Sequence, residues 1–144
     1  MLLRDRFGRA RRDGGHTHRR GDHTVASTAS HVGYRYTAGY TASKHAAVGF
    51  MRAVAAELAG TGVTANAVCP AFVRTDMTAT SVERIVSRSG RSTAEAEAAL
   101  AAASPLGRLL EPAEVAFAVS FLAATEAAAI NGQTLVLDGG GIQS

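Results

Sequence analysis

From about residue 24 onward the chain alternates short β-branched segments with longer helical ones, and this order limits the possible folds more than any other feature. Strands are predicted at His23–Ala29, Val63–Cys69 and Thr134–Asp138. Helices are predicted at Tyr40–Ala59, twice within Arg74–Ala103 with a break near Ser89-Gly90, and at Glu111–Ala124. Because helical crossovers join parallel strands, the order predicts an α/β fold with a parallel sheet.

The segment Tyr40–Ala59 carries the clearest helical pattern. Its larger apolar residues recur at spacings of three and four, on one face: Val48, Met51, Val54, Ala55 and Leu58. Gly60 follows at a common helix stop, and the Gly- and Tyr-rich stretch Gly33–Gly39 is expected to be a loop. Pro112 suits the first turn of the last predicted helix.

Composition excludes several classes of protein. No apolar run approaches the roughly 20 residues of a membrane span, so no membrane association is expected. Cys69 is the only cysteine, which excludes a disulfide framework and fits a reducing cytoplasm. The histidines His16, His18 and His23 lack an ordered scaffold and a carboxylate partner, so no metal site is expected.

Residues 1–23 differ from the rest of the chain in charge. They hold seven Arg against three Asp, a net charge of +4, with no apolar period. Three interpretations stay open: a disordered tail, an aberrant segment read from GC-rich DNA in a wrong frame, and a basic arm for nucleic acid. Nucleic acid is the least favoured, because Phe7 is the only aromatic residue available for stacking. We therefore divide the chain into residues 1–23 and a folded domain at 24–144.

The run Tyr40-Thr41-Ala42-Ser43-Lys44 carries the strongest chemical signal. Lys44 is the only lysine among 15 lysine and arginine residues. At positions i and i+4 of a helix the ammonium can lie beside the phenol of Tyr40 and favour its phenolate form. Ser27, thirteen residues before the tyrosine, could hold a substrate oxygen from the preceding strand end. This set can move a proton to or from an alcohol oxygen.

Simpler interpretations compete with each of these assignments. A Tyr and a Lys one turn apart are usually surface neighbours, so the pair alone is weak. Cys69 ends an apolar strand, where a small buried residue is a safer interpretation than a nucleophile. Ser27 does not stand in a G-x-S-x-G elbow, which argues against hydrolase chemistry. Asn66 and Asp138-Gly139-Gly140 are predicted to hold turns.

Further motifs follow in order along the chain. They are Asn66-Ala67-Val68-Cys69-Pro70-Ala71-Phe72-Val73-Arg74-Thr75, Pro105-Leu106-Gly107-Arg108, Glu111-Pro112-Ala113-Glu114-Val115, Asn131-Gly132-Gln133 and Asp138-Gly139-Gly140. With Ser27, Tyr40 and Lys44 they resemble the C-terminal half of a short-chain dehydrogenase/reductase, from about Thr24 to Gly141. The resemblance implies an incomplete Rossmann-like, doubly wound parallel sheet that keeps the last three of seven strands.

The resemblance also implies roles for individual residues. Tyr40 would be the acid/base, Lys44 would favour its phenolate and hold the nicotinamide ribose, and Ser27 would orient the substrate oxygen. The residues after the second predicted strand would contact the nicotinamide of NAD or NADP: Pro70, Ala71, Val73 and Thr75. Ala71 stands where the family usually has Gly, a change that a backbone with negative φ tolerates. Arg74–Ala103 would form the variable substrate lid.

The family's first half is missing from this sequence. The only G-x-G-x-x-A string, Gly60–Ala65, follows a predicted helix, whereas a phosphate-binding turn precedes one. The sequence therefore supports two hypotheses. The first is an NAD(P)-dependent oxidoreductase that interconverts a secondary alcohol and a ketone, such as a hydroxyacyl or hydroxy-acid substrate, in a homo-oligomer. The second is a truncated, catalytically incompetent chain that serves as an oligomerisation or interaction module.

Overall fold

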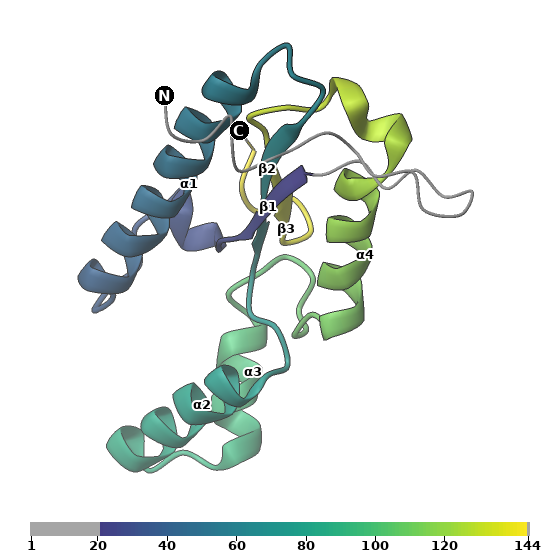
Figure 1. The fold of residues 1–144 in the computed structure, drawn as a ribbon. Coiled ribbons are helices and arrows are strands. Elements are labelled where there is room, and N and C mark those ends of the chain that lie inside the picture. The colour runs from purple at the N-terminus through teal and green to yellow at the C-terminus, as the bar shows by residue number, and fades with distance from the viewer. Residues whose placement is uncertain (1–20, 144) are drawn as a thin grey trace.

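The computed structural model describes residues 21–143. Its helices and strands follow one another in the order β1 (Gly21–Val25), η1 (Thr28–Ser30), α1 (Ala38–Leu58), β2 (Thr64–Pro70), α2 (Asp76–Ser89), α3 (Thr93–Ala101), α4 (Pro112–Ala123), η2 (Thr125–Ala129) and β3 (Thr134–Leu137). Here η marks a short 3-10 helix. Figure 1 shows α1 and α4 beside the strands, with α2 and α3 projecting together from one end of the sheet.

The three strands form one parallel sheet in the order β1-β2-β3. The central strand β2 pairs with β1 from Gly21↔Thr64 to Val25↔Val68. On its other side it pairs with β3 from Ala67↔Thr134 to Pro70↔Leu137. All seven residues of β2 are buried. The α/β fold and the parallel sheet are therefore confirmed.

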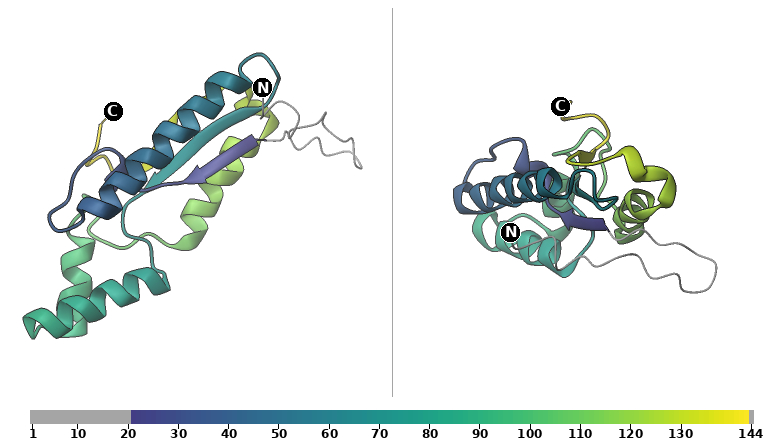
Figure 2. Two further views of the ribbon diagram at one scale, coloured as in Figure 1. Left: turned by 60° about the vertical axis from the view of Figure 1, so that its left-hand side comes forward. Right: turned by 45° about the horizontal axis from the view of Figure 1, so that its top comes forward.

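Helices α1 and α4 lie on opposite faces of this sheet (Figure 2). Ala65, Ala67 and Cys69 of β2 pack with α1, while Val68 packs with Ala118 and Leu122 of α4. This alternation follows from the two-residue period of a strand. Burial on both faces explains why the strand is mostly apolar, with Thr64 and Asn66 as its polar residues.

The buried face predicted for α1 is confirmed. The five predicted residues, Val48, Met51, Val54, Ala55 and Leu58, are at most 3% exposed. The helix begins earlier than predicted, at Ala38, because the amide of Thr41 already donates to the carbonyl of Thr37 at 2.7 Å. Gly60 has φ +77°, a left-handed conformation that ends the helix as expected.

The first strand is displaced from its prediction. It spans Gly21–Val25, and Ser27 lies beyond its end, where the Ser27 hydroxyl accepts a hydrogen bond from the amide of Ala29 at 3.1 Å and begins η1. Ser and Thr side chains compete with strand pairing in this way. Gly21–His23 belong to the sheet, so the domain begins earlier than the predicted boundary. The rest of the predicted basic segment, with its nucleic-acid and aberrant-segment hypotheses, lies outside the described residues.

The helical arm formed by α2 and α3 breaks where predicted. Gly90 adopts a left-handed φ of +68°, and Ser92 starts α3 through a capping box with Glu95. Pro70, predicted to follow its strand, is instead the last residue of β2. Pro112 occupies the first turn of α4 as expected.

Two asparagines, buried Asn66 and half-buried Asn131, join the N-terminal end of β2 to the segment before β3. Asn66 is fully buried; its amide nitrogen donates to the carbonyl of Ile130 at 2.8 Å, and its oxygen accepts from the amide of Gln133 at 3.0 Å. Asn131 donates to the carbonyl of Ala55 at 3.0 Å and accepts from the amide of Ala65 at 2.9 Å. The predicted turn-holding role of Asn66 is confirmed.

An ion pair secures the start of α4. Both terminal nitrogens of Arg108 donate to the carboxylate of Glu114, at 2.7 and 2.8 Å, and the amide of Glu111 also donates to it, at 2.8 Å. The Arg108 hydrogen bonds, with help from that amide, lower the pKa of Glu114 from 4.5 to about 2. A carboxylate with a depressed pKa stabilises the fold above its unfolded pKa and loses that contribution as the pH falls through its folded value.

Acid should therefore remove the stability that the ionised Glu114 contributes beyond a neutral side chain. We expect the urea midpoint of the native chain to exceed that of Glu114→Gln at about pH 6, and the gap to shrink steadily towards about pH 3. The difference will be small, because the pair is exposed to solvent. Urea titrations of both chains across this pH range measure it. A gap that stays constant with pH would contradict the assignment.

Candidate active site

The carboxyl ends of the strands gather the predicted site residues at one edge of the sheet. Ser27 follows β1, and Pro70–Thr75 spans the end of β2 and the loop that follows it. Helix α1 runs back along the sheet, so its first turns, with Tyr40 and Lys44, start from the same edge (Figure 2). Open parallel α/β sheets bind their ligands at this edge.

Tyr40 and Lys44 lie together, as their spacing predicted. The Lys44 ammonium is 5.6 Å from the centroid of the Tyr40 ring, within the range of a cation–π contact. The ring is 42% exposed and Lys44 is half-buried. Within residues 21–143 the Tyr40 hydroxyl has no hydrogen-bond partner. Its oxygen is therefore open to a ligand, and a positive charge lies over the ring that carries it.

Ser27 lies on the neighbouring segment rather than in direct contact with this pair. Its hydroxyl is half-buried and bonded to the amide of Ala29, and η1, which it begins, packs against α1. In the described part of the chain no hydrogen bond joins Ser27 to Tyr40 or Lys44. Because a hydroxyl has two lone pairs and its own proton, Ser27 can still donate to a ligand oxygen while it caps the turn.

The segment after β2 is held by backbone contacts on two sides. The amide of Ala71 donates to the carbonyl of Leu137 at 2.9 Å, and Val73 pairs with Leu110 in a parallel bridge. The carbonyl of Val73 accepts from the hydroxyl of Thr78 at 2.6 Å. Thr75 is exposed and precedes α2. The segment is thus fixed in place while Thr75 stays accessible to a ligand.

The backbone tolerates the alanine at position 71. Among the described residues other than glycine, Tyr36 alone has a positive φ, at 64°. Ala71 therefore does not need the left-handed conformation that favours glycine, as expected from sequence.

Sequence reasoning predicted the loop between η1 and α1, at Gly33–Gly39, but gave it no role in the site. Tyr34 donates its hydroxyl to the Thr28 hydroxyl at 3.2 Å, and Tyr36 is 99% exposed. The excess of Tyr and Gly in this loop was the sequence signal that could have pointed to such a role. Sequence reasoning also missed the two carboxylate partners of Arg74, which come from distant parts of the chain.

The geometry resolves one other candidate site, whereas His16 and His18 of the candidate metal site lie outside the described residues. The string Gly60–Ala65 is a helix stop and turn, as predicted, since both the amide and the hydroxyl of Thr61 bond to the carbonyl of Leu58, at 3.0 and 2.6 Å. Across residues 21–143 no three His, Cys, Asp or Glu side chains gather to hold a metal ion. No helix in that range is long and apolar enough to cross a membrane.

Cys69 is buried at the end of β2, and burial raises the pKa of its thiol. Because the thiolate is the reactive form, the native thiol should react with iodoacetamide at neutral pH about two orders of magnitude more slowly than in urea. Mass spectrometry of alkylated samples measures the rates. The matched control carries Cys69→Ala with Arg88→Cys on the exposed face of α2, and it should react rapidly under both conditions. Rapid native alkylation of Cys69 would contradict its burial.

Comparison with known proteins agrees with this fold. Residues 20–141 match a family model described as enoyl-(acyl carrier protein) reductase. A short chain dehydrogenase family protein from Francisella tularensis superimposes with a TM-score of 0.80 at 28% identity, over 83% of this chain and 50% of that one. The chain belongs to the short-chain dehydrogenase/reductase family.

Several members of this family resemble the chain more closely in sequence. A putative ketoacyl reductase of Streptomyces coelicolor is 45% identical over 116 residues, which cover 81% of this chain and 44% of that protein. The 3-oxoacyl-(acyl-carrier-protein) reductase of Escherichia coli is 40% identical, over 81% of this chain and 43% of that protein. An actinorhodin polyketide ketoreductase solved with NADPH has a TM-score of 0.78 at 42% identity, over 83% of this chain and 46% of that one. The chain thus spans a little under half the length of these relatives.

Proposed function

We propose that the chain carries the proton-transfer half of an NAD(P)-dependent oxidoreductase that interconverts a secondary alcohol and a ketone. The observation that carries the proposal is the Tyr40–Lys44 pair at the carboxyl edge of a parallel sheet. The Lys44 ammonium lies 5.6 Å from the centroid of the Tyr40 ring. The segments with Ser27 and with Pro70–Thr75 border the same edge. The names of the relatives support a ketoacyl substrate, and a cytoplasmic location suits such a protein.

The residues have separate tasks in this mechanism. The Tyr40 hydroxyl gives a proton to the carbonyl oxygen during reduction and takes it back during oxidation. The Lys44 ammonium, 5.6 Å from the centre of the Tyr40 ring, attracts the negative charge that the oxygen gains as the proton leaves. The Ser27 hydroxyl donates to the substrate oxygen and fixes its position. A bound nicotinamide supplies or accepts the hydride, which no side chain can do.

The residues present fit the nicotinamide end of such a cofactor. The Tyr40 hydroxyl lacks a partner within the described residues, and the Lys44 ammonium forms no salt bridge there, so both can bond to a ribose. Pro70, Ala71, Val73 and Thr75 would line the nicotinamide ring. Residues 21–143 contain no glycine-rich turn between a strand and a following helix for the pyrophosphate. Without that turn, the described residues do not select between NAD and NADP.

Titration of the chain with NADH and with NADPH, followed by nucleotide fluorescence, tests the proposal. We expect saturable binding that weakens in Lys44→Met and is unchanged in Arg88→Met, which removes an exposed cation from α2. The absence of saturable binding by the native chain would overturn the proposal, as would equal effects of the two substitutions.

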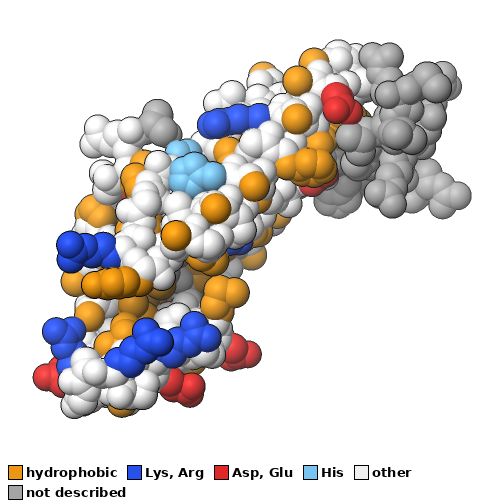
Figure 3. Space-filling model, turned by 90° about the vertical axis from the view of Figure 1, so that its left-hand side faces the viewer, with side chains coloured by type: hydrophobic (Ala, Val, Ile, Leu, Met, Phe, Trp, Pro, Cys, Tyr) orange, Lys and Arg blue, Asp and Glu red, His pale blue; other side chains and the backbone are white. Residues whose placement is uncertain are grey.

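A second candidate function, an oligomerisation module without catalysis, is favoured by the outer face of α1. Small residues recur along this exposed face at spacings of three and four: Ala42, Ala46, Gly49, Ala53 and Ala56. Phe50 stands beside them and is 65% exposed. Figure 3 shows hydrophobic side chains along this helix. A helix that is apolar on both faces normally has a partner on each, and small side chains allow a second helix to approach closely.

We infer that the partner is a second copy of the chain, with Phe50 of each copy over Gly49 of the other. A side-chain carbon placed on Gly49 would meet no atom within 4 Å, so room for the ring exists. Analytical ultracentrifugation should find a dimer that Phe50→Glu dissociates. The control is Phe117→Glu on α4, where the ring is 75% exposed. A monomeric native chain, or dissociation by Phe117→Glu instead, would contradict this interface.

A further inference from the structure

The arm formed by α2 and α3 leaves and rejoins the domain at one narrow root. The amide of Arg74 donates to the carbonyl of Leu110 at 2.8 Å, and the amide of Leu110 donates to the carbonyl of Phe72 at 2.8 Å. These bonds join the outgoing and returning segments side by side. Beyond the root, α2 and α3 pack on each other, away from the sheet (Figure 1).

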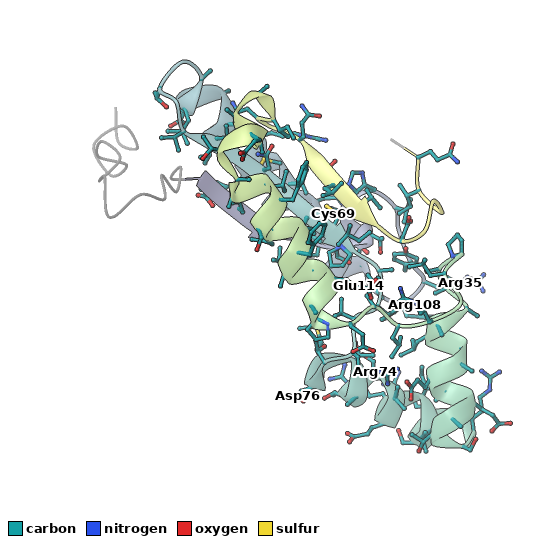
Figure 4. The ribbon with its side chains drawn as sticks, turned by 90° about the vertical axis from the view of Figure 1, so that its right-hand side faces the viewer. Arg35, Cys69, Arg74, Asp76, Arg108 and Glu114 are labelled. Carbon is teal, nitrogen blue, oxygen red and sulfur yellow. The ribbon has the colours of Figure 1, made fainter. Side chains whose placement is uncertain are left out.

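One side chain ties this root to the helices on both sides of it. The Arg74 guanidinium donates through Nη1 to Glu97 of α3 at 2.6 Å and through Nε to Glu111, directly before α4, at 3.1 Å. Figure 4 shows Arg74 where the arm meets the start of α4. The fixed fork of a guanidinium can hold two carboxylates at once, which the point charge of a lysine cannot do with the same geometry. Its hydrogen bonds to Glu97 and Glu111 raise the pKa of Arg74, so its charge persists.

Position in the chain gives these contacts their significance. Arg74 stands between Val73 and Thr75, two of the residues proposed to line the nicotinamide. Any movement of α3 that pulls on Glu97 is therefore transmitted to the same short segment, and Glu111 holds the guanidinium against the domain. Exposed ion pairs are weak one by one. Beyond its root the arm packs mainly on itself and not on the sheet, so weak forces at the root can bias its orientation.

We propose that Arg74 is a positioning residue that sets the orientation of the α2–α3 arm relative to the Pro70–Thr75 segment, through its paired contacts with Glu97 and Glu111. The functional consequence rests on the proposed function, since the arm would border the nicotinamide and substrate. Because both ion pairs are exposed, salt screens them. The arm is held most firmly at low ionic strength and released as salt rises.

Distances between spin labels test the orientation directly. The labels replace Arg88 on α2 and Ala116 on α4, which are both exposed and lie outside the inferred dimer face of α1, in a chain with Cys69→Ala. We expect a narrow distance distribution at about 0.05 M salt that broadens by about 1 M, where the Debye length is roughly 3 Å. Arg74→Gln should be broad at both salt concentrations. The control Arg84→Gln removes an exposed arginine of α2 and should behave as native.

Two further variants separate positioning from a loss of folding. Glu97→Gln removes a single contact and should broaden the distribution partially. The double variant Arg74→Glu, Glu97→Arg rebuilds one pair with reversed charges and should narrow the distribution relative to Arg74→Glu alone. Unchanged distances in Arg74→Gln, or no rescue by the reversed pair, would overturn the proposal. The distances do not depend on cofactor binding, so failure of the nucleotide titration would leave this result interpretable.

Discussion

Replacing Asn66 with Ala should destabilise the chain by about 3–5 kcal/mol, a large part of the stability of a domain this size. The Asn66 side chain is fully buried and bonds to the carbonyl of Ile130 and the amide of Gln133. The substitution leaves these two partly buried backbone groups without their side-chain partner and opens a cavity at a fully buried position. Each such group costs about 1–3 kcal/mol. The shift of the urea unfolding midpoint, with an unchanged slope, measures the loss.

Gln133→Ala is the matched control for Asn66→Ala. It removes an exposed side chain whose amide donates to the carbonyl of Asn131 at 3.2 Å, but it keeps the backbone amide that bonds to Asn66. We expect a loss under about 1 kcal/mol. Equal losses in the two variants would show that Asn66 does not hold the segment before β3.

Tyr40→Phe should lower the rate of ketone reduction by about 10²–10⁴-fold, the usual contribution of a positioned acid or base. The substitution keeps the ring under the Lys44 ammonium and removes only the hydroxyl. Nicotinamide affinity should therefore change by about threefold or less, since one of several ribose contacts is lost. The oxidation of NADPH with a ketoacyl thioester as substrate measures the rate, and nucleotide fluorescence measures the affinity.

Tyr34→Phe and Tyr36→Phe are the controls for this loss, because both tyrosines precede the same helix. Tyr34 bonds to Thr28 and Tyr36 is almost wholly exposed. Both variants should keep a rate within about tenfold of the native chain. A Tyr40→Phe chain that retained the native rate would remove Tyr40 from the mechanism, whatever the cofactor affinity.

Helix α1 shows how much of the fold could be predicted from the residues alone. Five apolar side chains at helical spacing predicted its buried face, and all five are buried. Its start was misplaced because Ala38 and Gly39 carry no apolar signal, and the first helical hydrogen bond, from Thr41 to Thr37, involves only backbone. The end of β1 was misplaced for a related reason. The Ser27 hydroxyl accepts a hydrogen bond from the amide of Ala29, and the chain turns into η1 there instead of continuing as a strand.

The candidate site divides in the same way between local and distant contacts. The contact of Tyr40 with Lys44 follows from a spacing of four on a helix, so it was predictable. The position of the Lys44 ammonium over the face of the Tyr40 ring could not be predicted, since it depends on the rotamers of both side chains. Arg74 gave no signal at all, because its partners Glu97 and Glu111 lie 23 and 37 residues away and could be any of nine acidic groups downstream of residue 24.

The sequence by itself determined the order of the strands and helices, the parallel sheet, the buried face of α1 and the pairing of Tyr40 with Lys44. The parallel sheet follows from the helical crossovers between its strands, and the buried face of α1 and the Tyr40–Lys44 pairing follow from the 3.6-residue period of a helix. Only the tertiary structure decided that Asn66 joins β2 to the segment before β3 and that Arg74 joins the arm to α4. These contacts depend on distances between residues remote in sequence, which arise when the sheet forms and both of its faces are covered.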